Sequence, residues 1–307
     1  MPGVSARAPA AGPGQLNNPF FVVPPFLLPN RLDIIDIIVD KREDIPKLGD
    51  MTEKSNNKPC IVFAPHADDA VFGCGGTILS RRKAGIEVYV VCLTDGRNSH
   101  LFRFGIKTNP TPYELAIQRE KEEKKAMRAL NVNEDHVIFL GIEDATLFRH
   151  KQEACQNVTQ IMEQLNPSEV FIPYIGDRHP DHVATHMIMR SCLNKLAVNP
   201  SVYQYFVWAV PDLKIKDKAI VVDISKELEA KKTAILHYGS QITSSLYPMQ
   251  ERPVLKGEFI SRFYKPEEVF LLENTVNLKG FNKLWIFTKL YFASYFLYFI
   301  KHLRYRL

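Results

Sequence analysis

Short apolar runs that alternate with longer polar or charged segments constrain the fold of this chain more than any other feature. Residues 60–64, 88–93, 137–140 and 170–174 have the length and composition of buried strands. The segments between them include a long charged stretch, 113–130, with apolar residues at helical spacing. Parallel strands need crossover connections, which are usually helices. The alternation therefore predicts an α/β fold, a doubly wound and mostly parallel sheet with helices on both faces.

The same pattern continues on either side of these segments. A Gly-rich turn, 73–77, leads into an expected helix at 77–84, and another helix follows His182. The remaining expected helices are 152–165 and 226–236, and the remaining expected strands are 203–210 and 219–224.

The predicted domain is a single one with a segment on each side. At 307 residues and 46% hydrophobic content, the chain can bury a sizeable core. Residues 1–30 hold seven prolines, so 1–58 is interpreted as a Pro-rich N-terminal arm and connecting segment. The compact domain is predicted at 59–272, and 273–307 forms a basic, aromatic-rich C-terminal segment.

Charge and cysteine content exclude several classes of protein. A formal charge of +5, from 39 Lys and Arg against 34 Asp and Glu, is too small for a typical nucleic-acid binder. Five widely spaced cysteines without a short-range pair are predicted to be buried reduced thiols. The N-terminus lacks a basic segment followed by an unbroken apolar run, so a cytoplasmic enzyme is the simplest expectation.

The C-terminal segment resembles an amphipathic helix. Residues 284–300 are rich in aromatics, but they are fewer than the ~20 apolar residues of a spanning helix and are interrupted by Lys289. On a helix at roughly 100° per residue, one polar face collects Lys283, Lys289, Ser294, Lys301 and Arg304. Two interpretations stay open: a peripheral membrane contact through 281–307, or a terminal helix packed on the domain or on a second subunit.

Two of the expected strands end in loops rich in histidine and aspartate. The strand at 60–64 and the strand at 170–174 lead into His66, Asp68, Asp69, His179, Asp181 and His182. Ligands of open α/β sheets bind outside the carboxyl ends of the strands, where these loops are expected. Two imidazoles and one carboxylate, with a water in the fourth position, are typical of catalytic zinc. A second carboxylate beside the metal can accept the proton of that water.

These loops and the residues around them resemble one known family. Residues 65–69 (PHADD) are similar to the PHPDD motif of the LmbE-like deacetylases, and 179–182 (HPDH) match that family's HPDH motif. The family includes the N-acetylglucosaminyl-phosphatidylinositol de-N-acetylases (PIG-L) and the enzymes of mycothiol metabolism. Further similarity extends in order over roughly 59–272, through the Gly-rich segment 73–77 and the charged helix containing Arg119.

The resemblance implies a set of roles for the motif residues. The implied zinc ligands are His66, Asp69 and His182, and Asp68 is the general base that activates water. His179 is then the group that stabilises the oxyanion or protonates the leaving amine, and Asp181 orients it. Amide hydrolysis needs a proton at nitrogen because an expelled amide anion is too basic, and these residue types can deliver one.

The resemblance also implies a substrate class. Arg119 and Asp144 fall where relatives contact the sugar or its substituent, and a structural ion pair is an equal alternative for them. The implied function is zinc-dependent removal of an acetyl group from the nitrogen of an N-acetylated amino sugar, either lipid-linked or part of a glycoconjugate. The alternatives are an amidase for a thiol-sugar conjugate or antibiotic precursor and a non-catalytic zinc-binding relative.

Two departures from the motif affect these expectations. Ala67 replaces the family's Pro, and Ala70 replaces a Glu that follows the second Asp. Loss of an outer carboxylate can lower metal affinity or activity roughly 10- to 100-fold. Ala70 is therefore the one motif position that favours the non-catalytic alternative.

Overall fold

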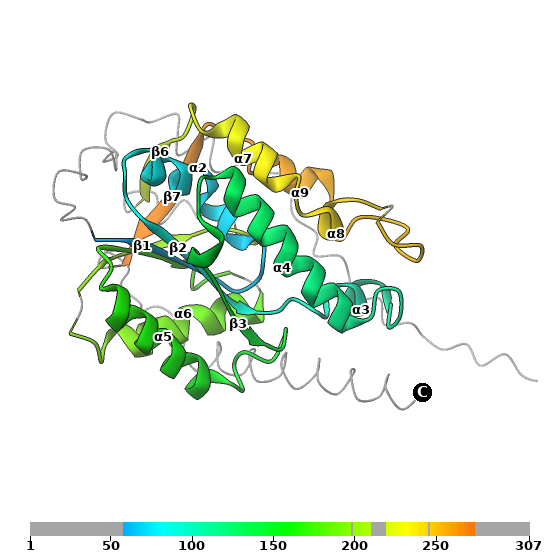
Figure 1. Ribbon diagram of the computed structural model, residues 1–307, viewed down its shortest axis with the longest axis horizontal. Coiled ribbons are helices and arrows are strands. Elements are labelled where there is room, and N and C mark those ends of the chain that lie inside the picture. Colours follow the sequence, from blue (N-terminus) through cyan, green and yellow to red (C-terminus); the bar gives the residue numbers. More distant parts are fainter. Residues whose placement is uncertain (1–57, 178, 198, 210–218, 245, 274–307) are drawn as a thin grey trace, which may run out of the picture. The chain divides into compact units, whose positions relative to one another are not determined.

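A seven-stranded sheet is the centre of this computed structural model, which describes residues 58–177, 179–197, 199–209, 219–244 and 246–273 (Figure 1). Its strands are β1 (Cys60–Ala64), β2 (Val88–Thr94), β3 (Val137–Ile142), β4 (Glu169–Pro173), β5 (Ser201–Tyr205), β6 (Ala219–Asp223) and β7 (Glu267–Leu272). Their order across the sheet is β3-β2-β1-β4-β5-β7-β6.

Strand direction confirms the prediction of a mostly parallel sheet. Neighbours from β3 to β5 all pair in parallel, whereas β7 pairs antiparallel with both β5 and β6. From β1 the chain builds outward to β2 and β3, and then returns to place β4 on the other side of β1. The strand order thus reverses between β1 and β4, and ligands of such sheets bind at this switch point.

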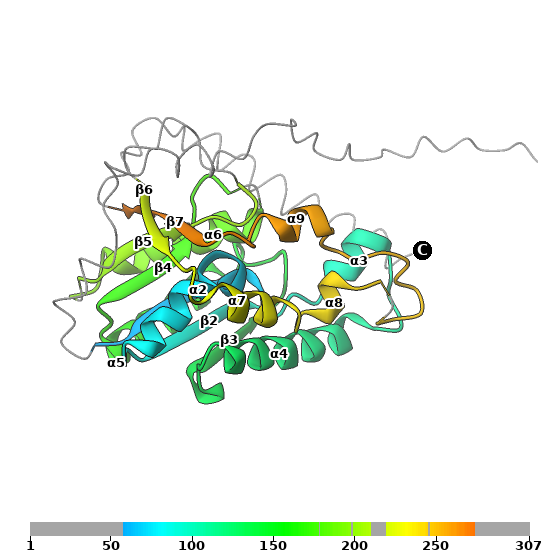
Figure 2. The ribbon, with the colours of Figure 1, turned by 90° about the horizontal axis from the view of Figure 1, so that it is seen from above.

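Helices cover both faces of the sheet, as Figures 1 and 2 show. The helices are α2 (Asp69–Lys83), α3 (Ser99–Phe104), α4 (Pro112–Ala129), α5 (Lys151–Leu165), α6 (Pro180–Leu193), α7 (Leu228–Ile235), α8 (Gly239–Ile242) and α9 (Gly257–Ser261), with a 3-10 turn η3 (Glu134–His136). Helices α2, α4 and α7 lie on one face, and α5 and α6 lie on the other. In β1, Val62 packs into the first layer and Phe63 into the second, because alternate side chains of a strand point to opposite faces.

Most expected elements are present with shifted ends, and β7 was missed. The long charged helix is α4, which begins at Pro112 because Thr111 and Glu114 form a reciprocal capping box. The strand expected at 203–210 ends earlier, at Tyr205. Antiparallel β7 needs no crossover helix, so the strand-helix alternation on which the prediction rested gave no signal for it.

The Gly-rich segment is helical, contrary to the predicted turn. Helix α2 begins at Asp69 and includes Gly73 and Gly76. A Cβ at Gly73 would collide with the ring of Tyr205, and a Cβ at Gly76 would collide with Ile224. The glycines let α2 approach the sheet closely, and this tertiary role outweighs their low helix propensity.

The cysteine prediction holds for three residues and is wrong for two. Cys60, Cys74 and Cys92 are free and buried. Cys155 on α5 and Cys192 on α6 are paired as a disulfide, with Cα atoms 5.9 Å apart. The packing of α5 on α6 brings these residues together, which a separation of 37 positions in the sequence does not reveal.

The N-terminal arm and the C-terminal amphipathic helix lie outside the described residues, except for Lys58 and Glu273. Their predicted roles therefore stay predictions. Among the described residues, none of the helices combines the length and apolar character needed to cross a membrane.

Candidate active site

The two motif loops lie side by side at the carboxyl edge of the sheet. One follows β1 and enters α2, and the other follows β4 and enters α6, while β1 and β4 are paired neighbours. The first loop is held by Thr94 at the end of β2, whose N–H and hydroxyl both donate to the Pro65 carbonyl, at 2.9 and 2.8 Å. The switch point of the sheet thus brings together loops that are more than a hundred positions apart in the sequence.

Asp69 is in contact with both of the histidines expected as ligands. Asp69 Oδ2 lies 3.1 Å from His66 Nδ1 and 3.1 Å from His182 Nε2. Zinc bonds of ~2.0–2.1 Å in tetrahedral geometry would place ligand atoms roughly 3.3 Å apart. His182 Nε2 is buried and, apart from this ion-pair contact with Asp69, has no hydrogen-bond partner among the described residues, so it is available as a ligand. The residues present therefore fit a divalent metal.

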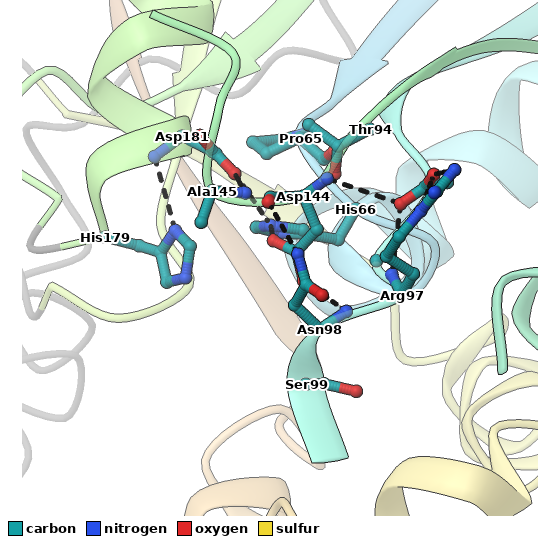
Figure 3. Close-up of polar contacts among 12 residues, drawn as sticks. Pro65, His66, Thr94, Arg97, Asn98, Ser99, Asp144, Ala145, His179 and Asp181 are labelled. Atoms are coloured by element: carbon teal, nitrogen blue, oxygen red, sulfur yellow. Dashed lines mark hydrogen bonds and ion pairs between the residues drawn. The ribbon is translucent and has the colours of Figure 1, made fainter. Parts of the chain in front are cut away.

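Each of the two histidines expected as ligands also has a carboxylate at its other ring nitrogen. His66 Nε2 lies 3.2 Å from Asp144 Oδ1 and 3.4 Å from Asp181 Oδ2, and His182 Nδ1 lies 3.1 Å from Asp177 Oδ2 (Figure 3 shows the His66 side). Metal-binding histidines usually donate their second N–H to such a carboxylate, which fixes the tautomer and the ring orientation. Asp177 was missed by the sequence analysis, and its only signal was its position at the end of the β4 loop, two residues before His179.

Among the described residues, two groups of side chains have ligand atoms close enough to share an ion, and the expected ligand Asp69 is in neither of them. Within each group, the atoms of His66, His179 and His182, or of His66, Asp144 and Asp181, lie within 4.8 Å of one another. The rings of His179 and His66 have centroids 4.7 Å apart. The cluster is therefore dense in imidazoles and carboxylates, a donor set that suits zinc.

Neighbouring charges raise the pKa of His182 and lower the pKa of Asp69, in both cases against the effect of burial. Burial lowers the pKa of His182, but the Asp69 and Asp177 carboxylates outweigh it and raise the pKa to about 9. Burial raises the pKa of Asp69, but the positive charges of His182 and His66 hold that pKa well below its ordinary value. Without a metal, His182 thus carries a proton at neutral pH, and metal binding must release it.

Asp68 occupies a strained position next to the ligands. Its φ is 129°, in a region that residues other than glycine rarely adopt, and it precedes the first turn of α2. Arg119 Nη2 donates to Asp68 Oδ2 at 3.0 Å and to the Ala67 carbonyl at 2.6 Å. Burial raises the pKa of Asp68 to about 7, although Arg119 opposes the shift. A carboxylate with a pKa near neutral is suited to accept and return a proton.

Arg119 forms an ion pair with Asp68, which is the structural alternative that the sequence left open. The guanidinium is 4% exposed, and its Nη1 also donates to the Gly96 carbonyl at 3.2 Å. Gly96 has a φ of 61°, and a Cβ there would lie 2.5 Å from Arg119 Nη1. Glycine at this position lets Arg119 reach Asp68.

Asp144, the second predicted sugar contact, is also used within the protein. It is 5% exposed; Oδ2 accepts from the Asn98 N–H at 3.1 Å, and Oδ1 faces His66 (Figure 3). Both of its oxygens are therefore occupied by protein donors. In the structure Asp144 contacts His66 and the Asn98 backbone.

His179 is in contact with the cluster, and its partner atom in Asp181 differs from the expectation. The backbone N–H of Asp181 donates to His179 Nδ1 at 3.3 Å, whereas the Asp181 carboxylate accepts from the Ala145 N–H at 2.7 Å and faces His66 (Figure 3). Burial lowers the pKa of His179 to about 4, and the charges of His66 and His182 act in the same direction. Since Nδ1 accepts, neutral His179 carries its proton on Nε2, where it can donate to an oxyanion.

Comparison with known proteins finds one similar family. Residues 61–193 match the model of the family described as PIG-L: GlcNAc-PI de-N-acetylase. The matched region spans β1 to α6 and so includes both motif loops.

The similar proteins are named as deacetylases or probable deacetylases. The chain is 26% identical over 207 residues to diacetylchitobiose deacetylase from Thermococcus kodakarensis, covering 63% of this chain and 74% of that protein. It is 27% identical over 195 residues to a probable N-acetyl-alpha-D-glucosaminyl L-malate deacetylase 2 from Bacillus anthracis, covering 62% of this chain and 84% of the other. The structure of N,N'-diacetylchitobiose deacetylase from Pyrococcus horikoshii has a TM-score of 0.52 at 23% identity, covering 83% of this chain and 100% of that one, and so shares the fold.

Proposed function

We propose that this protein is a zinc-dependent hydrolase that removes the acetyl group from the nitrogen of an N-acetylated amino sugar. The observation that carries the proposal is the contact of Asp69 Oδ2 with both His66 Nδ1 and His182 Nε2, with Asp68 next to it in the chain. The names of the relatives support the substrate class, because they describe deacetylases of diacetylchitobiose and of an N-acetylglucosaminyl malate.

The proposed mechanism assigns one task to each side chain. Zinc held by His66, Asp69 and His182 would polarise the amide carbonyl and lower the pKa of water to roughly 7. Asp68, held by Arg119, accepts the proton of the attacking water. The Nε2–H of His179 donates to the oxyanion that develops on the carbonyl oxygen, a contact typically worth roughly 3–4 kcal/mol. Asp68 then returns its proton to the amide nitrogen, so that a neutral amine leaves.

A direct test combines metal content with acetate release. Purified protein is expected to contain one zinc per chain and to release acetate from at least one member of a panel of N-acetylglucosamine conjugates, including lipid-linked ones. Asp68→Ala should retain zinc and lose activity, whereas Asp135→Asn, which removes an exposed charge on η3, should change neither. Stoichiometric zinc without acetate release from any member of the panel would favour the non-catalytic alternative. Acetate release only from thiol-sugar conjugates would favour the amidase.

We also propose that residues 281–307, which lie outside the described residues, bring the enzyme to anionic membrane surfaces. The proposal is based on the basic face of this segment and on the absence of acidic residues after Glu273. The full-length chain should bind anionic vesicles in a salt-dependent manner, and a variant with Lys283, Lys289 and Lys301 replaced by glutamate should not. Equal recovery of both proteins in the soluble fraction would contradict it and would favour packing of this segment on the domain or on a second subunit.

A further inference from the structure

A partly exposed tryptophan lies next to the catalytic cluster. Trp208 follows β5 at the carboxyl edge of the sheet and is 36% exposed. Its ring centroid is 6.3 Å from that of His179, and the two ring planes are inclined by only 24°. The flanking Val207 and Ala209 are buried, at 2% and 8% exposure, so they anchor the backbone while the indole remains accessible.

The backbone of Trp208 is held by a carboxylate that also contacts the cluster. The backbone N–H of Trp208 donates at 3.2 Å to Asp177 Oδ2, the same oxygen that lies 3.1 Å from His182 Nδ1. The indole packs against Phe259 of α9, with centroids 4.6 Å apart. Phe259 in turn packs against Phe72 of α2, at 5.9 Å. Trp208 is therefore a rigid aromatic surface that loses little conformational entropy when a ligand binds.

We propose that Trp208 forms a subsite that binds the apolar face of a sugar ring while the ring's N-acyl group lies at His179. This inference rests on the proposed function and adds the element that recognises the sugar. A pyranose presents C–H groups on its faces and hydroxyls around its edge, so it can cover an indole and keep its hydroxyls hydrated. Trp208 is one of the exposed large apolar side chains among the described residues, and its ring contacts that of His179 in the cluster.

The subsite also explains how the sugar can be recognised although Arg119 and Asp144 are buried and used within the protein. Both residues are at most 5% exposed, so neither offers a free surface to the ring. Stacking on Trp208 contributes equally to binding of the substrate and of the transition state. Its loss should therefore raise KM and leave kcat nearly unchanged.

Steady-state kinetics test the assignment. Trp208→Ala should raise KM about tenfold, equivalent to ~1.4 kcal/mol, with kcat within about threefold and unchanged zinc content. Trp208→Phe should restore most of the affinity because it keeps an aromatic face. Leu236→Ala, which removes a 65% exposed apolar side chain at the end of α7, is the control and should leave both constants unchanged. An unchanged KM in a folded, active Trp208→Ala enzyme would overturn the proposal.

Fluorescence tests the subsite independently of turnover. The chain contains two tryptophans, so Trp285→Phe leaves Trp208 as the sole indole emitter. N-acetylglucosamine should change the emission of this variant saturably and should leave the emission of the doubly substituted Trp208→Phe, Trp285→Phe protein unchanged. If the wild type releases no acetate but the emission still saturates, the proposed function fails and the subsite stands. If acetate is released and calorimetry shows sugar binding without any change in Trp208 emission, the subsite proposal fails and the proposed function stands.

Discussion

Asp177 provides the sharpest test of how the proposed metal site is built, because the sequence motif does not include it. The residue is 3% exposed, and its carboxylate lies 3.1 Å from His182 Nδ1, so it holds the ring with Nε2 directed at Asp69. Asp177→Asn keeps the shape and removes the charge. Loss of such an outer partner is expected to weaken zinc binding roughly 10- to 100-fold, or ~1.4–2.7 kcal/mol. Competition with a chromogenic chelator measures this affinity.

The pH dependence of that loss follows from the pKa of His182. Burial lowers this pKa, but Asp69 and Asp177 raise it to about 9. In the wild type, a proton on His182 therefore opposes metal binding below pH 9 and is lost above that pH. At pH 7 this competition costs the wild type roughly 100-fold in apparent affinity, at tenfold per pH unit. In Asp177→Asn the proton on His182 competes less with the metal, because one of the two carboxylates that raise the pKa of His182 is gone. The difference between the two proteins should therefore be small at pH 7 and widen toward pH 9.

Asp135→Asn removes the same charge from an exposed position and should match the wild type throughout. If Asp177→Asn bound zinc as tightly as the wild type at pH 9, with an unchanged melting temperature, the reasoning about the second ring nitrogen would be refuted.

Three further predictions concern the residues around Asp68. Asp68→Asn should keep its zinc and lower kcat about 10²- to 10⁴-fold, as steady-state acetate release would show. Gly96→Ala adds a Cβ 2.5 Å from Arg119 Nη1 at a φ of 61°, so it should destabilise the fold by ~1–2 kcal/mol and lower kcat without removing zinc, checked by denaturation, kinetics and metal analysis. Burial raises the pKa of Glu123 to about 8, although the Tyr238 hydroxyl donates to it, against an ordinary value of 4.5. Between about pH 4.5 and 8, Glu123 then loses its proton in the unfolded chain but keeps it in the folded one. The free energy of unfolding of the wild type should therefore fall over that range by up to roughly 5 kcal/mol. Urea titrations of Glu123→Gln should show no such fall.

Each of these predictions can fail in a specific way. Loss of zinc from Asp68→Asn would make Asp68 a ligand instead of a base. Full activity of Gly96→Ala would show that Arg119 does not control Asp68. Parallel stability curves for wild-type and Glu123→Gln proteins would show that Glu123 is ionised in the folded state.

The sequence predicted the sheet and the convergence of the two loops because both depend on local patterns. Continuous apolar runs such as 60–64 and 170–174 identify buried parallel strands, and the motif residues follow these runs directly. Once the strands are parallel neighbours, their carboxyl ends must meet at one edge of the sheet. The contact between His66 and His182 around Asp69 therefore needed only the strand order and a motif resemblance.

The roles of Arg119, Asp144 and Asp181 could not be predicted in this way, because they depend on which atom faces which partner. A buried arginine near a site satisfies its donors wherever acceptors lie, and here these are Asp68 and the carbonyls of Ala67 and Gly96. Sequence position cannot distinguish that arrangement from a sugar contact. The exposed fraction of the side chain distinguishes them, and it is a property of the folded protein.

Ala70 illustrates the same difference between a motif and a site. The family has a glutamate at this position, so the resemblance implied that Ala70 removes a carboxylate near the metal and lowers metal affinity. In the structure Ala70 is fully buried among apolar residues of the layer formed by α2, α4 and α7. His66 Nε2 already lies between Asp144 and Asp181, which come from the loop after β3 and the first turn of α6. A carboxylate at position 70 would add a buried negative charge to a histidine that already has its acceptors, so the replacement by alanine gives no physical reason to expect weaker metal binding.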